Sequence, residues 1–368
     1  MAKKTLYVSI SGHGYGHIGQ MAPILNKLAM DHGRQLEFVI QCQAQERFLS
    51  NTFCFDFRHI PGSADVGMVM GNSMDVLPQQ SHQAYRELFD HRDRELTLQA
   101  REIERHKADL VLSNVSYLTL AAAKRLSLPT IGLCSLNWAD IYATYCSNFT
   151  GADAVHEQAL QCYRSADHFL IPTPGMPMAD LPNRRIIGPL SRLSNRYPNF
   201  KASLGLSGKQ RLVMVSMGGI PHPLASKHWP AIEDVVWLDG SNATQARSDI
   251  IPLNRLNVPF VDVLGHCDLV ICKPGYGLFA EATCNGIPLL YVKREGWPEQ
   301  PYLISWLEAS NLCDELSRKA FDGGDFQQPV ENLLQRARTE KPTPVMPTGV
   351  GEACGYILEG LGLVGAGY

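Results

Sequence analysis

The chain has 368 residues, of which 45% are hydrophobic and 19% charged, and its formal net charge is -3. This composition is that of a globular protein, and the length predicts two domains rather than one core. The near balance of charges, without a basic stripe, argues against nucleic acid as a partner, and no apolar run reaches the ~18 residues of a transmembrane helix. The ten cysteines lack the paired spacing of metal ligands, which favours a reduced, cytoplasmic protein.

The first predicted strand, residues 5–11, runs directly into a glycine-rich turn. Five residues of this turn are candidates to line a cleft: Gly12, His13, Gly14, Gly16 and His17. The alternating glycines do not follow the Gly-x-Gly-x-x-Gly spacing of dinucleotide-binding folds, so hydride transfer is a poor fit. A helical pattern follows and places His17 at a helix N-terminus, where the dipole keeps an imidazole neutral and able to accept a proton. The plain alternative is a structural histidine.

Strands and helical patterns alternate over the rest of the first half, which predicts a parallel α/β sheet. The further strands are predicted near 36–41, 55–60, 109–113, 129–134 and 168–172. Residues 61–81 form a long loop rich in Gly, Met and Asp, and loops of this length are usually functional or mobile. A charged helix over 82–106 follows, with the mixed charges of a solvent-exposed face.

A change of composition at 193–210 predicts a linker between a first domain over 1–192 and a second domain over 211–350. After a first apolar strand, the second domain has predicted strands near 233–238, 268–272 and 288–292, and helices near 261–266, 277–285, 300–310 and 329–338. The last segment, 351–368, is expected to form an apolar helix that crosses back to the first domain.

The most informative segment, 273–282, joins a buried strand to a helix through a turn that contains Gly275 and Gly277. Glycines let backbone N–H groups approach an anion closely, and both the helix N-terminus and Lys273 add positive charge. Glu281 lies about one turn into the helix, where a carboxylate can accept hydrogen bonds from a diol such as ribose. A diphosphate beside a sugar is what a nucleotide-sugar presents. The alternative is a glycine-punctuated turn with a solvated Lys and Glu.

Two doubly wound domains would form a cleft between the carboxyl ends of their strands, where such folds bind ligands. The first domain would line this cleft with the turn 12–17. The second domain would line it with Gly218-Gly219, the turn 273–277 and Glu281.

Several of these segments are similar to a known family. Residues 16–23 resemble the Gly-His turn that opens the acceptor domain of GT-B glycosyltransferases. Residues 275–300 resemble the family's donor motif, with a Gly-rich turn, a Glu-Ala pair, a Gly-x-Pro and a final acidic-Gln pair. A closer likeness, over most of the chain, is to the glycosyltransferase-like N-terminal domain of plant L-arabinokinases. That likeness rests on residues 12–17, 137–143, 273–277 and 299–301, and we carry over the fold and cleft but not the arabinose phosphorylation.

The resemblance implies a GT-B fold, in which two Rossmann-like doubly wound α/β domains face each other across a cleft. It implies that His17 is the base that takes a proton from the acceptor hydroxyl. The donor contacts that it implies are Glu281 to the ribose hydroxyls, Lys273 to the diphosphate, Glu299 and Gln300 to the donor sugar, and Gly218 and Gly219 near the phosphates.

One position departs from the family pattern. Many relatives pair the base histidine with an aspartate, whereas Ser113-Asn114 offers an asparagine at that place. An Asn can orient a His tautomer but supplies no charge. Either Asp140 takes the part of the charged partner, or the site is not that of an orthodox transferase. The plain alternative for Asp140 is the N-cap of a helix over 141–147, and the two roles of Asp140 are compatible.

The sequence therefore favours a metal-independent, inverting glycosyltransferase that uses a nucleotide-diphosphate sugar, by family habit a UDP-sugar, and no cofactor. The absence of an Asp-x-Asp motif is typical of a site without a hard cation. The alternatives are a nucleotide-sugar hydrolase or epimerase on the same fold, or a non-catalytic nucleotide-sugar-binding protein, which Asn114 keeps open. A deep hydrophobic acceptor groove would favour transfer, and a small closed polar pocket would favour hydrolysis or epimerisation.

Overall fold

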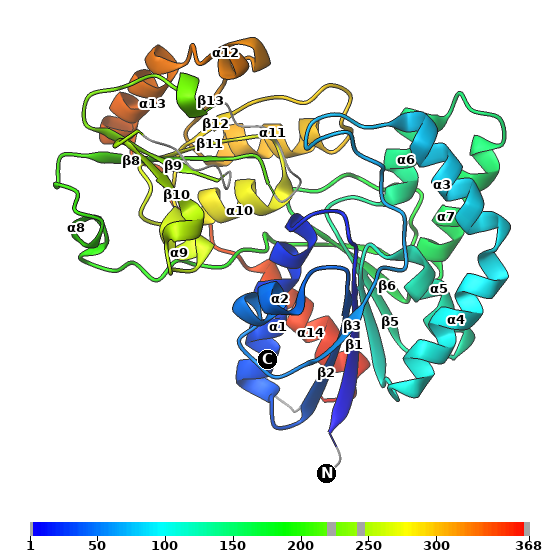
Figure 1. Ribbon diagram of the computed structural model, residues 1–368. Coiled ribbons are helices and arrows are strands. Elements are labelled where there is room, and N and C mark those ends of the chain that lie inside the picture. Colours follow the sequence, from blue (N-terminus) through cyan, green and yellow to red (C-terminus); the bar gives the residue numbers. More distant parts are fainter. Residues whose placement is uncertain (1–2, 219–225, 241–246, 364–368) are drawn as a thin grey trace.

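The computed structural model describes residues 3–218, 226–240 and 247–363 and contains two parallel β-sheets (Figure 1). The first sheet has the strand order β3-β2-β1-β4-β5-β6-β7. Its strands are β1 (Lys4–Ile10), β2 (Leu36–Cys42), β3 (Arg58–Pro61), β4 (Leu110–Asn114), β5 (Thr130–Leu133), β6 (His168–Pro172) and β7 (Arg184–Ile187). Among the residues expected to line a cleft, Gly219 lies outside the described residues.

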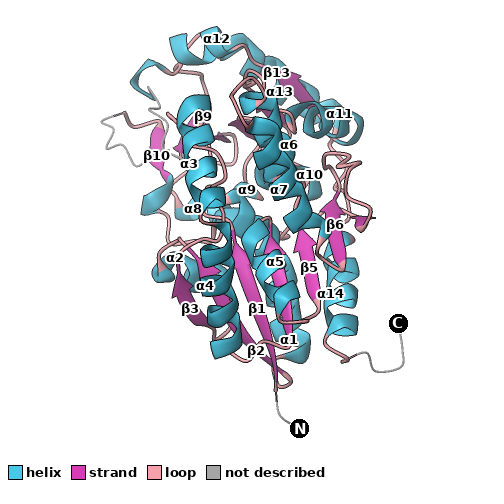
Figure 2. Cartoon of the chain, turned by 90° about the vertical axis from the view of Figure 1, so that its right-hand side faces the viewer, coloured by secondary structure: helices cyan, strands magenta, loops and turns pink. Residues whose placement is uncertain are grey.

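Helices cover both faces of the first sheet, because the side chains of its strands alternate between two buried clusters. Leu6 and Val8 of β1 pack on the side of α1, whereas Tyr7 packs on the side of α5. The helices are α1 (Gly16–His32), α2 (Glu46–Thr52), α3 (Pro78–Asp90), α4 (Arg92–Arg105), α5 (Tyr117–Arg125), α6 (Trp138–Cys146) and α7 (Ala152–Arg164). Figures 1 and 2 show α1 and α2 on one face of the sheet and α3 to α7 on the other.

The second sheet has the order β10-β9-β8-β11-β12-β13. Its strands are β8 (Arg211–Ser216), β9 (Val235–Asp239), β10 (Ile250–Pro252), β11 (Leu269–Cys272), β12 (Leu289–Tyr291) and β13 (Cys313–Glu315). The helices around it are α8 (Phe200–Ser203), α9 (Phe260–Leu264), α10 (Tyr276–Cys284), α11 (Gln300–Ser310), α12 (Arg318–Gly323) and α13 (Gln327–Glu340). The strand order reverses beside β1 in the first sheet and beside β8 in the second, and open parallel sheets bind ligands at such points.

The last helix, α14 (Gly349–Gly360), packs on the first sheet and not on the second. It contacts α1, β4 and β7, and Figure 1 shows it beside α1. The backbone N–H of Gly188 donates to the Glu352 carboxylate at 3.1 Å, which holds the start of the helix against the end of β7. Two segments, 188–210 and 341–348, therefore connect the two sheets.

The structure differs from the sequence expectations mainly at short or exposed elements. The strands β7, β10 and β13 were not predicted, because three or four residues with little alternation give no periodic signal. The expected charged helix over 82–106 is two helices, α3 and α4, which meet at His91 without a Pro or Gly to mark the break. The expected linker contains the short helix α8.

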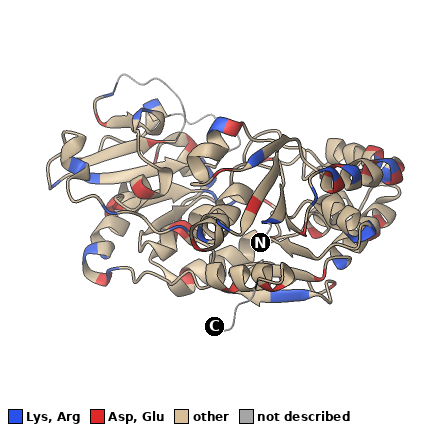
Figure 3. Ribbon diagram, turned by 90° about the horizontal axis from the view of Figure 1, so that it is seen from below, with Lys and Arg blue, Asp and Glu red and all other residues tan. Residues whose placement is uncertain are grey.

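Basic and acidic residues are interspersed along the ribbon in Figure 3, over both halves of the chain. None of the described helices has the length and apolar character that crossing a bilayer requires.

The long loop after β3 joins the two halves of the molecule. Met74 is only 5% exposed and belongs to the buried cluster of the second sheet, together with Leu316 and Phe321. The next residue, Asp75, accepts two hydrogen bonds from the Arg318 guanidinium, at 2.9 and 3.1 Å. A loop of the first half therefore places an apolar anchor and a carboxylate on the second.

This packing gives the first prediction. Met74→Ala should lower the free energy of unfolding by about 2–3 kcal/mol, because it leaves a cavity in a core that the loop helps to fill. Urea unfolding, followed by the fluorescence of Trp229 and Trp237 in the same cluster, measures the change. Met30→Ala is the control, since Met30 is 77% exposed and its loss should cost less than about 0.5 kcal/mol. Equal effects of the two changes would contradict the anchoring role of Met74.

Candidate active site

Two glycine turns, one from each half of the chain, face each other at the carboxyl ends of the two sheets. A Cβ built on Gly277, in the first turn of α10, would lie 3.8 Å from the Cα of Gly16 at the start of α1. Neither helix has a side-chain cap: the N-cap residues are Tyr15 for α1 and Gly275 for α10. Uncapped first-turn N–H groups carry partial positive charge and favour an anion.

A cavity of about 140 Å³ lies between these turns and is lined by both halves of the chain. Nine residues that the sequence singled out line it: His13, Gly14, Gly16, His17, Gly218, Lys273, Gly275, Gly277 and Glu299. Among the other lining residues, the following were not predicted to belong to the site: Gln20, Ser135, Trp138, Arg294 and Trp297. Gly12 instead lines a neighbouring cavity of about 390 Å³.

Two buried cations converge on the cavity. Burial and the nearby charge of Arg294 lower the pKa of Lys273 to about 7, although the charge of Glu299 opposes the shift. Burial also lowers the pKa of Arg294 to about 10. The Arg294 guanidinium lies 4.0 Å from the centroid of the Trp297 ring, and its Nε has no hydrogen-bond partner among the described residues. Because these two cations face the single carboxylate of Glu299, an anion would stabilise the site.

His17 is held by a neutral partner. Its Nδ1 lies 2.8 Å from Oδ1 of Asn114, and Nδ2 of Asn114 donates to Oε1 of Gln20 at 2.9 Å. Burial lowers the pKa of His17 to about 4, against which the hydrogen bond to Asn114 acts weakly. His17 is therefore a neutral imidazole near pH 7, which is the state that a general base needs.

The remaining wall of the cavity is aromatic. His13 lies edge-on to Trp138, with ring centroids 4.7 Å apart, and parallel to Trp297 at 6.2 Å. Burial lowers the pKa of His13 to about 3, and repulsion from a protonated His17 and from the two cations acts in the same direction. Trp138 is fixed in turn, since its Nε1 donates to Asp65 at 3.0 Å. His13 thus contributes a neutral, stacked surface.

Glu299 joins the two halves of the site. Its Oε1 accepts from the Ser135 hydroxyl at 2.6 Å, and its Oε2 accepts from Nε1 of Trp297 at 3.1 Å. The neighbouring Gln300 does not line the cavity; its Oε1 accepts from the backbone N–H of Arg294 at 2.7 Å. The two residues of the expected acidic-Gln pair therefore have different positions: Glu299 faces the cleft, whereas Gln300 holds the loop that carries Arg294.

The structure does not bring Asp140 to His17. Asn137, and not Asp140, is the N-cap of α6, and its side chain accepts from the Asp140 N–H at 2.8 Å. The Asp140 carboxylate accepts from Asn137 in return at 2.8 Å and lies 3.9 Å from Nε2 of His156. Asp140 belongs to the capping turn of α6, and Asn114 is the side chain that holds His17.

Glu281 is also placed differently from the expectation. Its carboxylate accepts from Nε of Arg192 at 2.8 Å, and its side chain is 8% exposed. It does not line the interdomain cavity. The arginine comes from the segment between the two sheets, so the pair fastens α10 to that segment and leaves the expected ribose contact without support.

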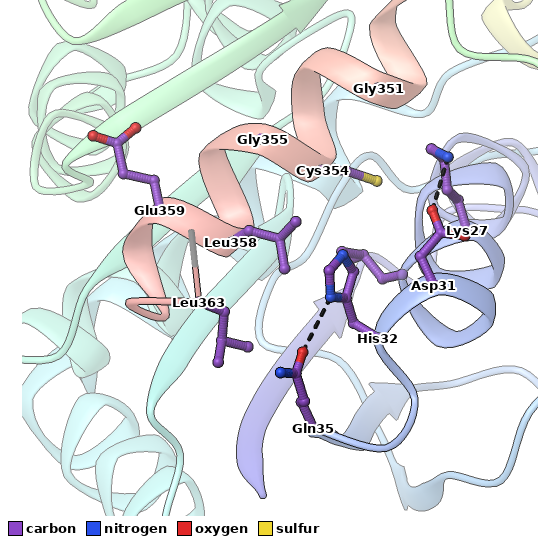
Figure 4. A pocket seen from close by; sticks show the side chains of 11 residues that line it. Lys27, Asp31, His32, Gln35, Gly351, Cys354, Gly355, Leu358, Glu359 and Leu363 are labelled. Carbon is purple, nitrogen blue, oxygen red and sulfur yellow. Dashed lines mark hydrogen bonds and ion pairs between the residues drawn. The ribbon is translucent and has the colours of Figure 1, made fainter. Parts of the chain in front are cut away.

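A larger cavity, of about 720 Å³, lies between α1 and α14 (Figure 4). Figure 4 shows that its polar groups bond to each other: Lys27 pairs with Asp31 at 2.8 Å, and His32 bonds to Gln35 at 3.2 Å. The interdomain cavity is smaller, but it gathers the buried histidines and cations, and it is therefore the candidate active site.

Comparisons with solved structures identify the architecture. The calicheamicin glycosyltransferase CalG4 matches with a TM-score of 0.66 and 15% identity, over 99% of this chain and 100% of that chain. The spinosyn rhamnosyltransferase SpnG matches with a TM-score of 0.59 and 16% identity, over 98% and 96%. A putative UDP-N-acetylglucosamine 2-epimerase from Listeria monocytogenes matches with a TM-score of 0.57 and 14% identity, over 97% and 95%. The chain has the GT-B fold.

Comparison of sequences finds a distant relative and no matching family model. No model of a known protein family matches the chain. A curated L-arabinokinase of Arabidopsis thaliana is 25% identical over 372 residues, which cover 95% of this chain and 34% of that protein. The chain thus spans about a third of the length of this relative. These matches confirm the predicted fold and are consistent with the predicted resemblance.

The buried, neutral His17 gives the second prediction. Its folded pKa of about 4 lies below the unfolded value of 6.5, so the unfolded state binds more protons between these pH values. Stability that is present above pH 6.5 is therefore lost as the pH falls towards 4, by about 2–3 kcal/mol for this one group. Urea unfolding of the wild type and His17→Gln from pH 7 to 4.5 measures the loss.

The difference in stability between the wild type and His17→Gln should shrink as the pH falls. The exposed His228 provides the control, and His228→Gln should keep the wild-type acid sensitivity. A difference between the wild type and His17→Gln that is independent of pH would contradict a buried neutral imidazole.

Proposed function

We propose that this chain is a glycosyltransferase that binds a nucleotide-diphosphate sugar in the interdomain cavity. The observation that supports this most strongly is the meeting of two buried cations, Lys273 and Arg294, with two uncapped helix N-termini. A diphosphate is the biological anion whose size and charge suit such a surface. We propose a UDP-sugar as the donor, because the GT-B glycosyltransferases that the sequence resembles commonly use one.

The cations would stabilise the leaving diphosphate as the glycosidic bond breaks. Preorganised positive groups in a water-poor site are most effective where charge develops in the transition state. Lys273 Nζ, the Arg294 guanidinium and the first-turn N–H groups of α10 are the groups that we assign to this role. The described residues hold no group of three or more His, Cys, Asp or Glu side chains suited to a metal ion.

The base in this proposal is Nε2 of His17. As the acceptor oxygen attacks the anomeric carbon, its proton passes to Nε2, and the bond between that carbon and the diphosphate oxygen breaks on the opposite face. The anomeric configuration is inverted, and one hydroxyl proton and one leaving diphosphate account for the charges. Asn114 holds the imidazole through Nδ1 without supplying a full negative charge.

The sizes of the two neighbouring cavities help to distinguish a transferase from a hydrolase or an epimerase. A cavity of about 140 Å³ is below the ~300–1,000 Å³ of ordinary ligand pockets, so the halves must separate to admit a donor. A pocket of this small size also suits a hydrolase or an epimerase, which are our second candidates. The neighbouring 390 Å³ cavity shares Gly14 and Tyr15 with the first and offers room for an acceptor, which favours transfer.

The third prediction tests the base. His17→Ala should lower the rate of UDP release from UDP-sugars by roughly 100- to 10,000-fold while donor affinity changes little, because the imidazole serves the acceptor side. His32→Ala, at the other end of the same helix, is the control and should keep the wild-type rate. Binding without turnover in the wild type would indicate a binding protein, and fast UDP release without acceptor would indicate a hydrolase. Failure to bind any nucleotide-sugar would overturn the proposal.

The fourth prediction concerns proton uptake. The folded pKa of Lys273 is about 7, so this amine is mostly neutral near pH 8, and a bound diphosphate should raise its pKa again. Binding of UDP near pH 8 should therefore take up about one proton, and affinity should rise as the pH falls towards 7. Calorimetry in two buffers with different ionisation enthalpies counts the protons.

Lys273→Met should abolish the proton uptake. The exposed Lys209 is the control, and Lys209→Met should leave it unchanged. UDP binding by the wild type without proton uptake would mean that Lys273 is not at the phosphates.

A further inference from the structure

Five buried polar side chains form a continuous hydrogen-bond chain between the two halves of the molecule. In order they are His17, Asn114, Gln20, Ser135 and Glu299, which are exposed by 7, 0, 3, 1 and 3%. The donor–acceptor distances along the chain are 2.8, 2.9, 2.9 and 2.6 Å. The first four residues belong to the first domain, whereas Glu299 precedes α11 in the second. We call these five residues the His17–Glu299 chain.

The carboxylate at one end fixes the direction of every hydrogen bond in this chain. Glu299 faces the cations Lys273 and Arg294, and its other oxygen accepts from Trp297, whose indole N–H can only donate. An acceptor-only carboxylate obliges the Ser135 hydroxyl to donate to it. The Ser135 oxygen is then free to accept from Nε2 of Gln20.

The orientation of Ser135 in turn determines the orientations of the Gln20 and Asn114 carboxamides. Because the Gln20 NH₂ group faces Ser135, its carbonyl oxygen faces Asn114 and accepts from Nδ2 of that residue. The Asn114 carbonyl oxygen therefore faces His17, and Nδ1 of His17 must carry the proton. The lone pair of the imidazole is left on Nε2.

We propose that Glu299 sets the tautomer of His17 from across the domain boundary, through Ser135, Gln20 and Asn114. The importance of this tautomer for catalysis rests on the proposed function, in which Nε2 of His17 is the base. Gln20 and Ser135 are positioning residues in this account. Since the link between Ser135 and Glu299 joins the two domains, His17 has its base tautomer fixed only while the domains are in contact.

One other group lies near Nδ1 of His17. The Cys134 sulfur is 3.8 Å away, which is a weak contact beside the 2.8 Å bond to Asn114. Burial raises the pKa of Cys134 to about 12, so near pH 7 it is a thiol and not an anionic acceptor. Asn114 is therefore the partner that decides which nitrogen is protonated.

Glu299→Gln provides a sharp test because it keeps the shape and changes the hydrogen-bonding pattern. Trp297 still donates, so the carbonyl oxygen of the introduced carboxamide should face it and the new NH₂ group should face Ser135. Within the chain, Gln20 is then the side chain left to accept the Ser135 proton, so we expect Ser135 to donate to Gln20 and both amides to turn over. The Asn114 NH₂ group would face His17, which reverses the tautomer and places the proton on Nε2.

Nitrogen-edited NMR of ¹⁵N-labelled protein near pH 7, without ligand, reports which ring nitrogen is protonated. His17→Gln identifies the signal by removing it. We expect an Nδ1–H imidazole in the wild type and an Nε2–H imidazole in Glu299→Gln. Glu281→Gln is the matched control, since it alters a buried carboxylate of the same domain outside the chain, and it should keep the wild-type tautomer. An Nε2–H imidazole in the wild type, or the same tautomer in folded Glu299→Gln, would overturn the inference.

A second pair of variants covers the case in which Glu299→Gln does not fold. Ser135→Ala cuts the chain, so His17 should show both tautomers, whereas Ser135→Thr keeps the hydroxyl and should restore the single Nδ1–H form. A single tautomer in Ser135→Ala would show that Asn114 acts alone. These measurements need no substrate, so a failed UDP-sugar assay would overturn the proposed function and leave the tautomer result standing.

Discussion

The carboxylate of Glu299 is the interaction on which both halves of the cleft depend. It accepts one hydrogen bond from Ser135 of the first domain and one from Trp297 of the second, and it is the negative group that faces Lys273 and Arg294. Without it, two cations would lie buried without compensation, at a cost of several kcal/mol. With Glu299 in place, one wall of the cleft carries two cations and one carboxylate, and the other wall carries the neutral imidazole of His17.

The rest of the fold holds these two walls in register. The hydroxyl of Tyr276, in the first turn of α10, accepts from the backbone N–H of Leu190 at 2.7 Å and donates to the Thr173 carbonyl at 3.2 Å. The pair between Arg192 and Glu281 fastens the same helix to the same connecting segment. A helix that presents its uncapped N-terminus to the cleft is thereby tied to the first domain. These contacts add to a buried cluster that the two domains share, in which side chains of α1 lie together with those of α10, so motion between the domains must disturb both.

The sequence predicted those cavity-lining residues whose position depends on the neighbouring strand and turn alone. A buried strand followed by glycines indicates a turn at the carboxyl edge of a sheet, so Gly14, Gly275 and Lys273, which line the cavity, could be predicted from the sequence. Arg294 could not, because it follows the three-residue strand β12 in a loop without periodicity. The pairing of Glu281 with Arg192 could not be predicted either, since the two residues lie 89 positions apart in the sequence. Pairings of this kind depend on how the two domains meet, which no spacing in the sequence records.

A crystal structure with bound UDP tests the central claim most directly. We expect both phosphates at the N-terminus of α10, within about 2.7–3.2 Å of Lys273 Nζ and the Arg294 guanidinium, with His17 across the cleft. UDP bound outside the cleft, or in the cleft with its phosphates away from both cations, would contradict it.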